Sequence, residues 1–177
     1  ATVTRVPVTR EPTLTATATD PTFTEGNGAL ALFNSAAANA IEVGQTFDTL
    51  VLTVSNVGDG TNEKLSVDGS VVDLVAAGPI ATASGYLVSV GVVGTTATVT
   101  GDTRRRAATG PETATLVDGL AYQNISADPT TLDRVVTLVT LPASGRTGPV
   151  PGHDTAHPAI TPTLSPDPAH PPPPRPP

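Results

Sequence analysis

The chain has 177 residues, which is enough for one domain of ordinary size and too few for two full cores. It contains no Cys, Met or Trp and only 3% aromatic residues, so disulfides and thiolate sites are excluded and the core must be largely aliphatic. A formal net charge of -7 is a poor match for nucleic acid, and no stretch of about 18 apolar residues predicts a membrane span.

Composition divides the chain into three parts. Residues 1–12 alternate Val with polar residues and end at Pro12, which predicts one strand followed by a linker. Residues 13–141 are rich in Thr and Val, and β-branched residues favour strands. Residues 142–177 hold most of the prolines, which lack an N–H donor, so we expect a disordered or semi-rigid polyproline tail.

Alternating polar and apolar residues, separated by Gly, Asn and Asp, predict an all-β sandwich for the central part. The expected strands cover residues 13–19, 29–33, 47–55, 64–69, 70–75, 86–92, 96–100, 120–124 and 134–141.

Two hairpins and one helix are predicted between these strands. Asp68-Gly69 suits a two-residue turn in which both residues have positive φ, and residues 93–96 suit a second hairpin. Residues 110–120 predict a short helix, because Pro111 and Glu112 fit a first turn and apolar residues recur at helical spacing. We expect this helix to cross from one sheet to the other.

Patterns for catalysis and nucleotide binding lack the context that they need. Residues 26–31, GNGALA, match a loose dinucleotide pattern, but a strand follows where that pattern requires a helix. The three histidines, His153, His157 and His170, all lie in the Pro-rich part, where nothing holds a base beside a nucleophile. We therefore expect that the protein is not an enzyme. The basic run at residues 104–106 is interpreted as a solvated loop.

Three stretches carry a resemblance to a known family. They read PTFTEGNGALALF (21–33), TFDTLVLTVSNVGDGTNEKLSVDG (46–69) and TATLVDGLAYQNISADPTTLDRVVTLVTL (113–141). They resemble the cadherin-like tandem repeats of giant bacterial surface and secreted adhesins, which are related to chondroitin sulfate proteoglycan repeats. The resemblance implies an Ig-like Greek-key β-sandwich, an extracellular or cell-surface location and neighbouring repeats in the same chain.

The linker departs from the family pattern. The family usually has Val-Asn-Asp-Ala-Pro where this chain has Val8-Thr9-Arg10-Glu11-Pro12. In cadherin-like linkers the Asn and Asp help to hold calcium, whereas Thr9 and Arg10 supply neither ligand. Arg10 also repels a cation.

Calcium is nevertheless the sharpest site hypothesis, because an acidic sandwich end can supply the oxygen ligands that calcium takes. The candidates are Glu25 after an early strand, Asp59 in the loop NVGDGTNE and Asp128 in the loop SADP. Topology of the Ig-like kind would bring them to one pole. The alternative is that Asp59-Gly60 and Asp128-Pro129 simply form turns.

The C-terminal part departs from the family as well. A final strand should lie near residues 153–165, but Pro158, Pro162 and Pro166 remove donors from its ladder, so we expect that strand to be doubtful. A reading-frame shift in the coding sequence is one hypothesis for this Pro-rich run, and translation of the other frames would test it.

These observations predict a structural stalk or spacer repeat of an extracellular bacterial adhesin, which extends a distal binding region. The first alternative is a calcium-dependent adhesion module that touches a cell-surface protein or a glycan through Glu25, Asp59 and Asp128. A catalytic β-sandwich is the third class, and it would need a cleft with convergent polar groups.

Overall fold

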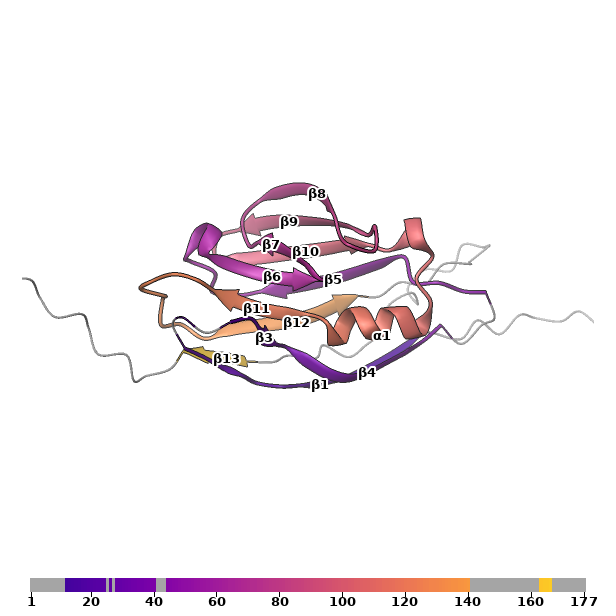
Figure 1. The fold of residues 1–177 in the computed structure, drawn as a ribbon, viewed down its shortest axis with the longest axis horizontal. Coiled ribbons are helices and arrows are strands. Elements are labelled where there is room, and N and C mark those ends of the chain that lie inside the picture. The colour runs from indigo at the N-terminus through magenta and orange to yellow at the C-terminus, as the bar shows by residue number, and fades with distance from the viewer. Residues whose placement is uncertain (1–11, 25, 27, 41–43, 141–162, 167–177) are drawn as a thin grey trace, which may run out of the picture.

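The computed structural model describes residues 12–24, 26, 28–40, 44–140 and 163–166. These residues form an all-β structure with one α-helix, as the sequence predicts (Figure 1). The N-terminal strand and linker predicted for residues 1–12, including Thr9 and Arg10, lie outside the described residues except for Pro12. The strands are β1 (Thr13–Ala18), β2 (Thr22–Phe23), β3 (Leu30–Ala31), β4 (Phe33–Asn39), β5 (Thr49–Val54), β6 (Glu63–Val67), β7 (Ser70–Asp73), β8 (Ala77–Ala81), β9 (Leu87–Val93), β10 (Thr96–Asp102), β11 (Ala121–Asn124), β12 (Arg134–Thr140) and β13 (Thr163–Pro166).

The described strands form three sheets. One has seven strands in the order β2-β13-β12-β5-β10-β9-β8, and a second has four in the order β3-β11-β6-β7. The pair β1-β4 forms the third. The pairings are antiparallel except between β13 and β2, which run parallel.

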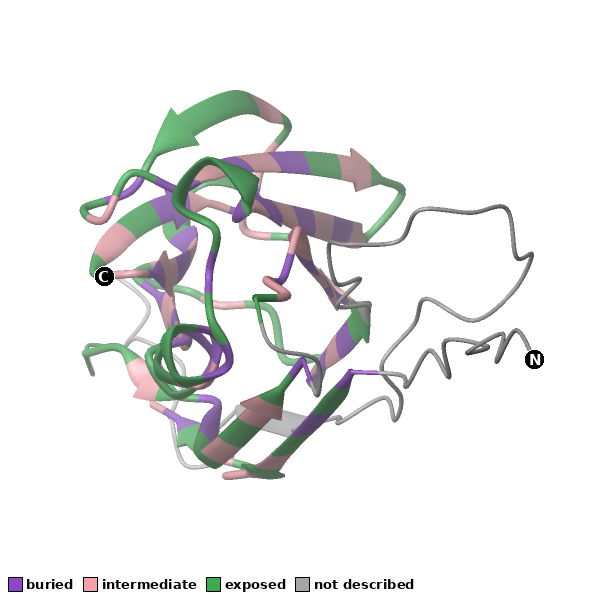
Figure 2. Cartoon of the chain, turned by 90° about the vertical axis from the view of Figure 1, so that its right-hand side faces the viewer, coloured by how far each residue is buried: buried purple, intermediate pink, exposed green. Residues whose placement is uncertain are grey.

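The two larger sheets enclose one core. Along β5, Leu50, Leu52 and Val54 are buried while the residues between them are half-buried, and β6 buries Leu65 and Val67 in the same alternating way. Figure 2 shows this alternation along the strands that surround the interior. Because successive strand residues point to opposite faces, each sheet presents one apolar face to the shared core.

Both predicted hairpins are confirmed. Asp68 and Gly69 have φ of 51° and 69° between β6 and β7, where Val67 pairs with Ser70. Gly94, with φ of 60°, occupies the turn between β9 and β10. Both turns therefore use residues that tolerate positive φ, which two-residue hairpins require.

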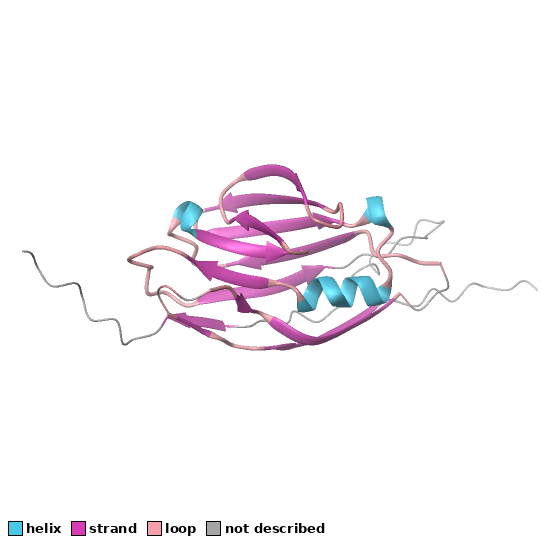
Figure 3. Ribbon diagram, viewed as in Figure 1, coloured by secondary structure: helices cyan, strands magenta, loops and turns pink. Residues whose placement is uncertain are grey.

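The predicted crossover helix is also confirmed, as α1 (Gly110–Asp118) (Figure 3). Thr109 and Glu112 form a reciprocal capping box at its start, and the helix connects β10 of the seven-stranded sheet to β11 of the four-stranded sheet. Gly110 lies so close to β4 that a Cβ atom there would be 2.2 Å from the Ala38 carbonyl oxygen. The helix can pack on β4 at this distance only because the residue is glycine.

Three strands differ from the predictions. The sequence pattern ends a strand at Phe33, whereas β4 continues to Asn39 through three alanines, and β8 (Ala77–Ala81) was not predicted. Both sequences have weak strand propensity, so pairing with β1 and β9 decides their conformation. In the Pro-rich part, we expected the prolines to disfavour a final strand near residues 153–165, but β13 forms at residues 163–166. Its residues 163–165 retain their N–H groups, and Pro166 stands at its end.

The first and last described strands lie toward opposite ends of the long axis. Thr13 of β1 pairs with Asn39, whose neighbour Ala38 lies against the start of α1. At the other end, Leu164 of β13 pairs with Arg134, the first residue of β12. Figure 1 shows the start of α1 at the right and β13 at the left.

Candidate functional site

The most concentrated polar chemistry in the described chain is a buried ion-pair cluster around Arg134. The Arg134 side chain has no exposed surface, and its Nη2 atom lies 2.8 Å from Oε1 of Glu63 and 3.0 Å from Oδ2 of Asp59. Nη1 donates to the backbone carbonyls of Thr130 and Leu132. The guanidinium also lies 5.8 Å from the centre of the Phe23 ring, a distance at which a cation and an aromatic face attract.

Backbone and side-chain donors satisfy the two carboxylates as well. Glu63, which is fully buried, accepts hydrogen bonds from the N–H groups of Gly58 and Asp59 and from the Tyr122 hydroxyl. Asp59 accepts from the Asn124 side chain at 2.7 Å and from the Thr130 N–H. A buried charge is tolerated only with such partners, and each charged group of this cluster has them.

The cluster joins the two larger sheets. Glu63 and Tyr122 belong to β6 and β11 of the four-stranded sheet, whereas Arg134 begins β12 of the seven-stranded sheet. The hydrogen bonds with Glu63 hold the pKa of Arg134 above its ordinary value although burial alone would lower it. Burial and the neighbouring Glu63 carboxylate raise the pKa of Tyr122. The arrangement therefore holds fixed charges and protonated donors, which suits an electrostatic clamp between sheets.

The structure places the three predicted calcium ligands differently. Glu25 lies outside the described residues. Asp59 belongs to the Arg134 cluster, and Asp128 is exposed, with its backbone N–H donating to the Ser126 hydroxyl. Within residues 12–140 and 163–166, leaving out the gaps named above, no three Asp, Glu or His side chains gather closely enough to hold a metal ion. Calcium binding therefore stays a prediction.

Sequence reasoning did not single out Glu63 or Arg134. A signal for Arg134 was present, because it alternates with Val136 and Leu138, which put it on the buried face of the strand. A charged residue at an inward position needs a buried partner, and Glu63 stands likewise in register with Leu65 and Val67. The pairing of Glu63 with Arg134 could not be predicted, because the pattern of either strand does not indicate which strand lies opposite.

A second polar junction links the sheets at the other end. The Asp68 carboxylate, in the β6–β7 turn, accepts hydrogen bonds from the Thr82 hydroxyl at 2.6 Å and from the Ser84 N–H and hydroxyl at 2.7 and 2.8 Å. Burial alone would raise the pKa of Asp68, but these hydrogen bonds outweigh it and lower the pKa below 3.8. The loop between β8 and β9 is thus fixed onto the β6–β7 turn.

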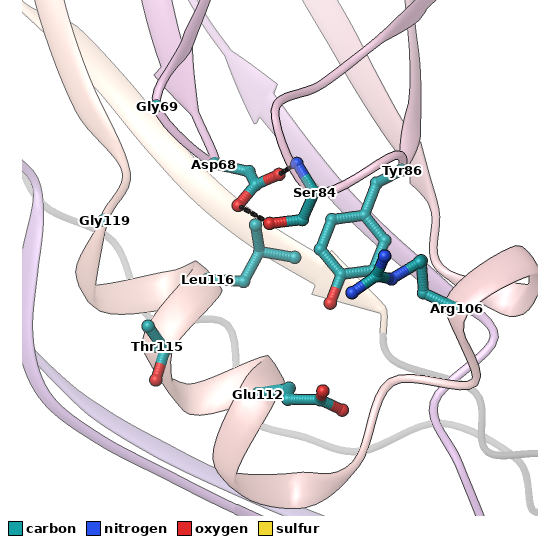
Figure 4. A pocket seen from close by; sticks show the side chains of 9 residues that line it. All are labelled: Asp68, Gly69, Ser84, Tyr86, Arg106, Glu112, Thr115, Leu116 and Gly119. Carbon is teal, nitrogen blue, oxygen red and sulfur yellow. Dashed lines mark hydrogen bonds between the residues drawn. The ribbon is translucent and has the colours of Figure 1, made fainter.

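A cleft of about 310 Å³ opens beside this junction (Figure 4). Its wall is formed by Ser84 and Tyr86 on the β8–β9 side and by Glu112 and Leu116 on α1. Arg106 contributes from the predicted basic loop, where Arg104–Arg106 form one 3₁₀ turn, η2. The cleft brings together polar side chains from segments that are far apart in the sequence.

Comparison with protein-family models, with curated proteins and with solved structures found no significant match for the chain. Among the residues described, no helix is long and apolar enough to span a bilayer.

Proposed function

We propose that this protein is a structural spacer module of an extracellular bacterial adhesin, with neighbouring repeats of the same chain as its partners. The proposal includes an Ig-like Greek-key arrangement of the sheets. Its support is the resemblance of residues 13–141 to cadherin-like repeats, together with the all-β structure around a single core.

The observation that carries the proposal is the position of the first and last described strands. β1 begins at the end where α1 starts, and β13 runs to the opposite end, where β12 starts (Figure 1). Modules joined in series through such ends add their lengths along one axis. A module whose ends lay side by side would fold the assembly back on itself.

The direction of these strands also suits a module under tension. β1 runs inward from Thr13 while paired with β4, and β13 runs outward to Pro166 while paired with β12 and β2. A force that separates the two ends acts along both strands and loads their hydrogen bonds together. Shear of this kind must break several bonds at once, which slows forced unfolding.

The two polar junctions strengthen the same module. The Arg134 cluster ties the sheets near β13, and the Asp68 junction ties them beside α1. Both would resist sliding of one sheet over the other. Shear would leave the buried charges of Arg134 and Glu63 without partners at one junction, and it would break the hydrogen bonds that Asp68 accepts at the other.

Single-molecule force spectroscopy tests the proposal on the 177-residue chain held at its two ends. We expect one cooperative event that releases about 500 Å of chain for residues 13–166, at a maximum of 3.3–3.6 Å per residue. A matched control holds the N-terminus and Asn39→Cys, an exposed position at the end of β4, which is feasible because the chain has no Cys. This geometry peels β1 from β4 one pair at a time and should need a lower force. Equal forces in the two geometries would contradict the spacer proposal.

Calcium binding through Glu25, Asp59 and Asp128 would make the chain a calcium-dependent adhesion module instead. A cation at Asp59 would have to compete with Arg134, Asn124 and Thr130 for the carboxylate. Thermal unfolding with calcium and with a chelator separates the two functions. Calcium bound only to the native state must raise the midpoint, and the spacer proposal expects equal midpoints.

A further inference from the structure

The cleft beside α1 has the composition of a small binding site and is separate from the predicted calcium ligands. Its volume of about 310 Å³ lies at the small end of the range for ligand pockets, ~300–1,000 Å³. Leu116 and Tyr86, both largely buried, provide an apolar floor and wall. Figure 4 shows Asp68, Ser84, Tyr86, Arg106 and Leu116 facing one another, from the β6–β7 turn, the β8–β9 loop, η2 and α1.

One wall of the cleft is preorganised. Asp68 fixes Ser84 through two hydrogen bonds, and the Tyr86 N–H donates to the Thr82 hydroxyl at 3.1 Å. The Ser70 hydroxyl further accepts from the Ala83 N–H. A ligand therefore meets a loop that is already ordered, so little conformational entropy is lost on binding.

Two donors in the cleft have no hydrogen-bond partner within the described parts of the chain. The charge of Arg106 lies near enough to Asp68 and Glu112 to help lower the pKa of both carboxyls, but Arg106 forms no ion pair there, whereas Arg104 in the same turn pairs with Asp102. The Tyr86 hydroxyl makes no hydrogen bond to a described residue, and the residue as a whole is 6% exposed. Both groups are lining residues of the cleft and are free to donate to a ligand.

The remaining polar groups are acceptors. The Ser84 and Thr115 hydroxyls already donate to Asp68 and to the Pro111 carbonyl, so toward a ligand they can only accept. Glu112 uses Oε2 for the Thr109 cap, which leaves Oε1 available. The cleft thus presents donors and acceptors side by side, with charges of both signs.

We propose that this cleft binds a neutral, hydroxyl-rich ligand of the size of one sugar unit. Each hydroxyl of such a ligand can donate to Glu112, Ser84 or Thr115 and accept from Arg106 or Tyr86. Its C–H groups can lie against Tyr86 and Leu116. A zwitterion such as a free amino acid fits less well, because stripping water from an ammonium and a carboxylate is costly and exposed charge pairs repay little.

The test is an NMR titration of the full chain with D-glucose, D-galactose and N-acetylglucosamine, with glycine and glutamate as charged probes. We expect at least one sugar to bind with a dissociation constant of about 1 mM, shifting amide signals of residues 84–86 and 112–116. Glycine and glutamate should leave those signals unchanged. Binding of the amino acids but not the sugars, or of no probe, overturns the proposal.

Two variants test the assignment of donors. Arg106→Gln should weaken sugar binding about five-fold or more, as expected for loss of a charged donor, whereas the neighbouring Arg105→Gln should not. Tyr86→Phe removes only the hydroxyl and should also weaken binding, with the amide spectrum reporting that the fold is intact. If Arg106→Gln and Tyr86→Phe both bind as the wild type does, the site is elsewhere. The outcome is independent of the spacer function, which the force measurement tests separately.

Discussion

Replacement of Arg134 by Met tests whether the buried Arg134 cluster stabilises the contact between the two larger sheets. Met fills a similar volume but removes the cation that lies 2.8 Å from Glu63 and 3.0 Å from Asp59. It also removes the donors to the carbonyls of Thr130 and Leu132. The carboxylates of Asp59 and Glu63 then lose their cation, in a site where the side chains of residues 63 and 134 have no contact with water.

The magnitude follows from what each carboxylate keeps. Removing one partner of a buried ion pair costs about 3–5 kcal/mol. Glu63 retains two backbone donors and the Tyr122 hydroxyl, and Asp59 retains Asn124 and Thr130, so we expect a value near the lower limit. A loss of about 3 kcal/mol is a large part of a total stability of about 5–15 kcal/mol.

Urea unfolding followed by circular dichroism measures this loss. With a slope of about 2 kcal/mol per M, the midpoint of Arg134→Met should fall by about 1.5 M. Arg104→Met is the matched control, because Arg104 pairs with Asp102 on the surface and its side chain is 65% exposed; its midpoint should not change measurably. The cost of Glu63→Gln should also shrink when Arg134 is already Met, since the two residues share one interaction. Equal midpoints for the two Arg variants, or additive costs for Glu63 and Arg134, would refute the cluster as a clamp.

Three further predictions concern the rest of the fold. Gly110→Ala should lower the free energy of unfolding by about 1–3 kcal/mol, because its Cβ would lie 2.2 Å from the Ala38 carbonyl oxygen. Gly91→Ala, which has open space around it, should not lower the free energy of unfolding. Equal losses for the two variants in chemical denaturation would contradict the close approach at Gly110. Asp68 has a lowered pKa, so its contribution to stability is present above its ordinary value of 3.8 and lost as pH falls through its folded value. The stability gap between wild type and Asp68→Asn should therefore close in acid, and a gap that stays constant down to the lowest pH would count against the hydrogen bonds at Ser84. Burial raises the pKa of both tyrosines, so the stability that comes from their neutral hydroxyls is fully present below pH 10.0 and is lost as the pH rises further. Ultraviolet absorbance at pH 10.0 should therefore show less than half of the tyrosine ionised. Half-ionisation at that pH would argue against burial of the two side chains.

The sequence predicted the elements that depend on local pattern. Alternation located the strands that became β5, β6, β9, β10 and β12, because one polar and one apolar face appear directly as a period of two. Asp68-Gly69 and Pro111-Glu112 located a hairpin and a helix start because their backbone preferences act within a few residues. The sequence failed for β4 and β8, whose Ala, Gly and Pro residues carry no strand signal until a neighbouring strand supplies hydrogen bonds.

The candidate site was predictable only in part. Asp59 was singled out as an acidic loop residue, but its partner is the guanidinium of Arg134, 75 residues further along the chain. The cleft was not predicted at all, because its lining comes from four separate segments between Asp68 and Gly119. No local pattern indicates that these segments meet.

The sequence by itself determined the all-β class, the inward or outward face of each regular strand and the positions of the tight turns. The physical reason is that side-chain alternation and backbone preference are properties of neighbouring residues. Only the tertiary structure decided that Glu63 meets Arg134 and that Asp68 fixes Ser84, because these contacts depend on which strand ends the sheet order brings together. Both contacts tie the two larger sheets together, and the Asp68–Ser84 contact also lines the cleft beside α1.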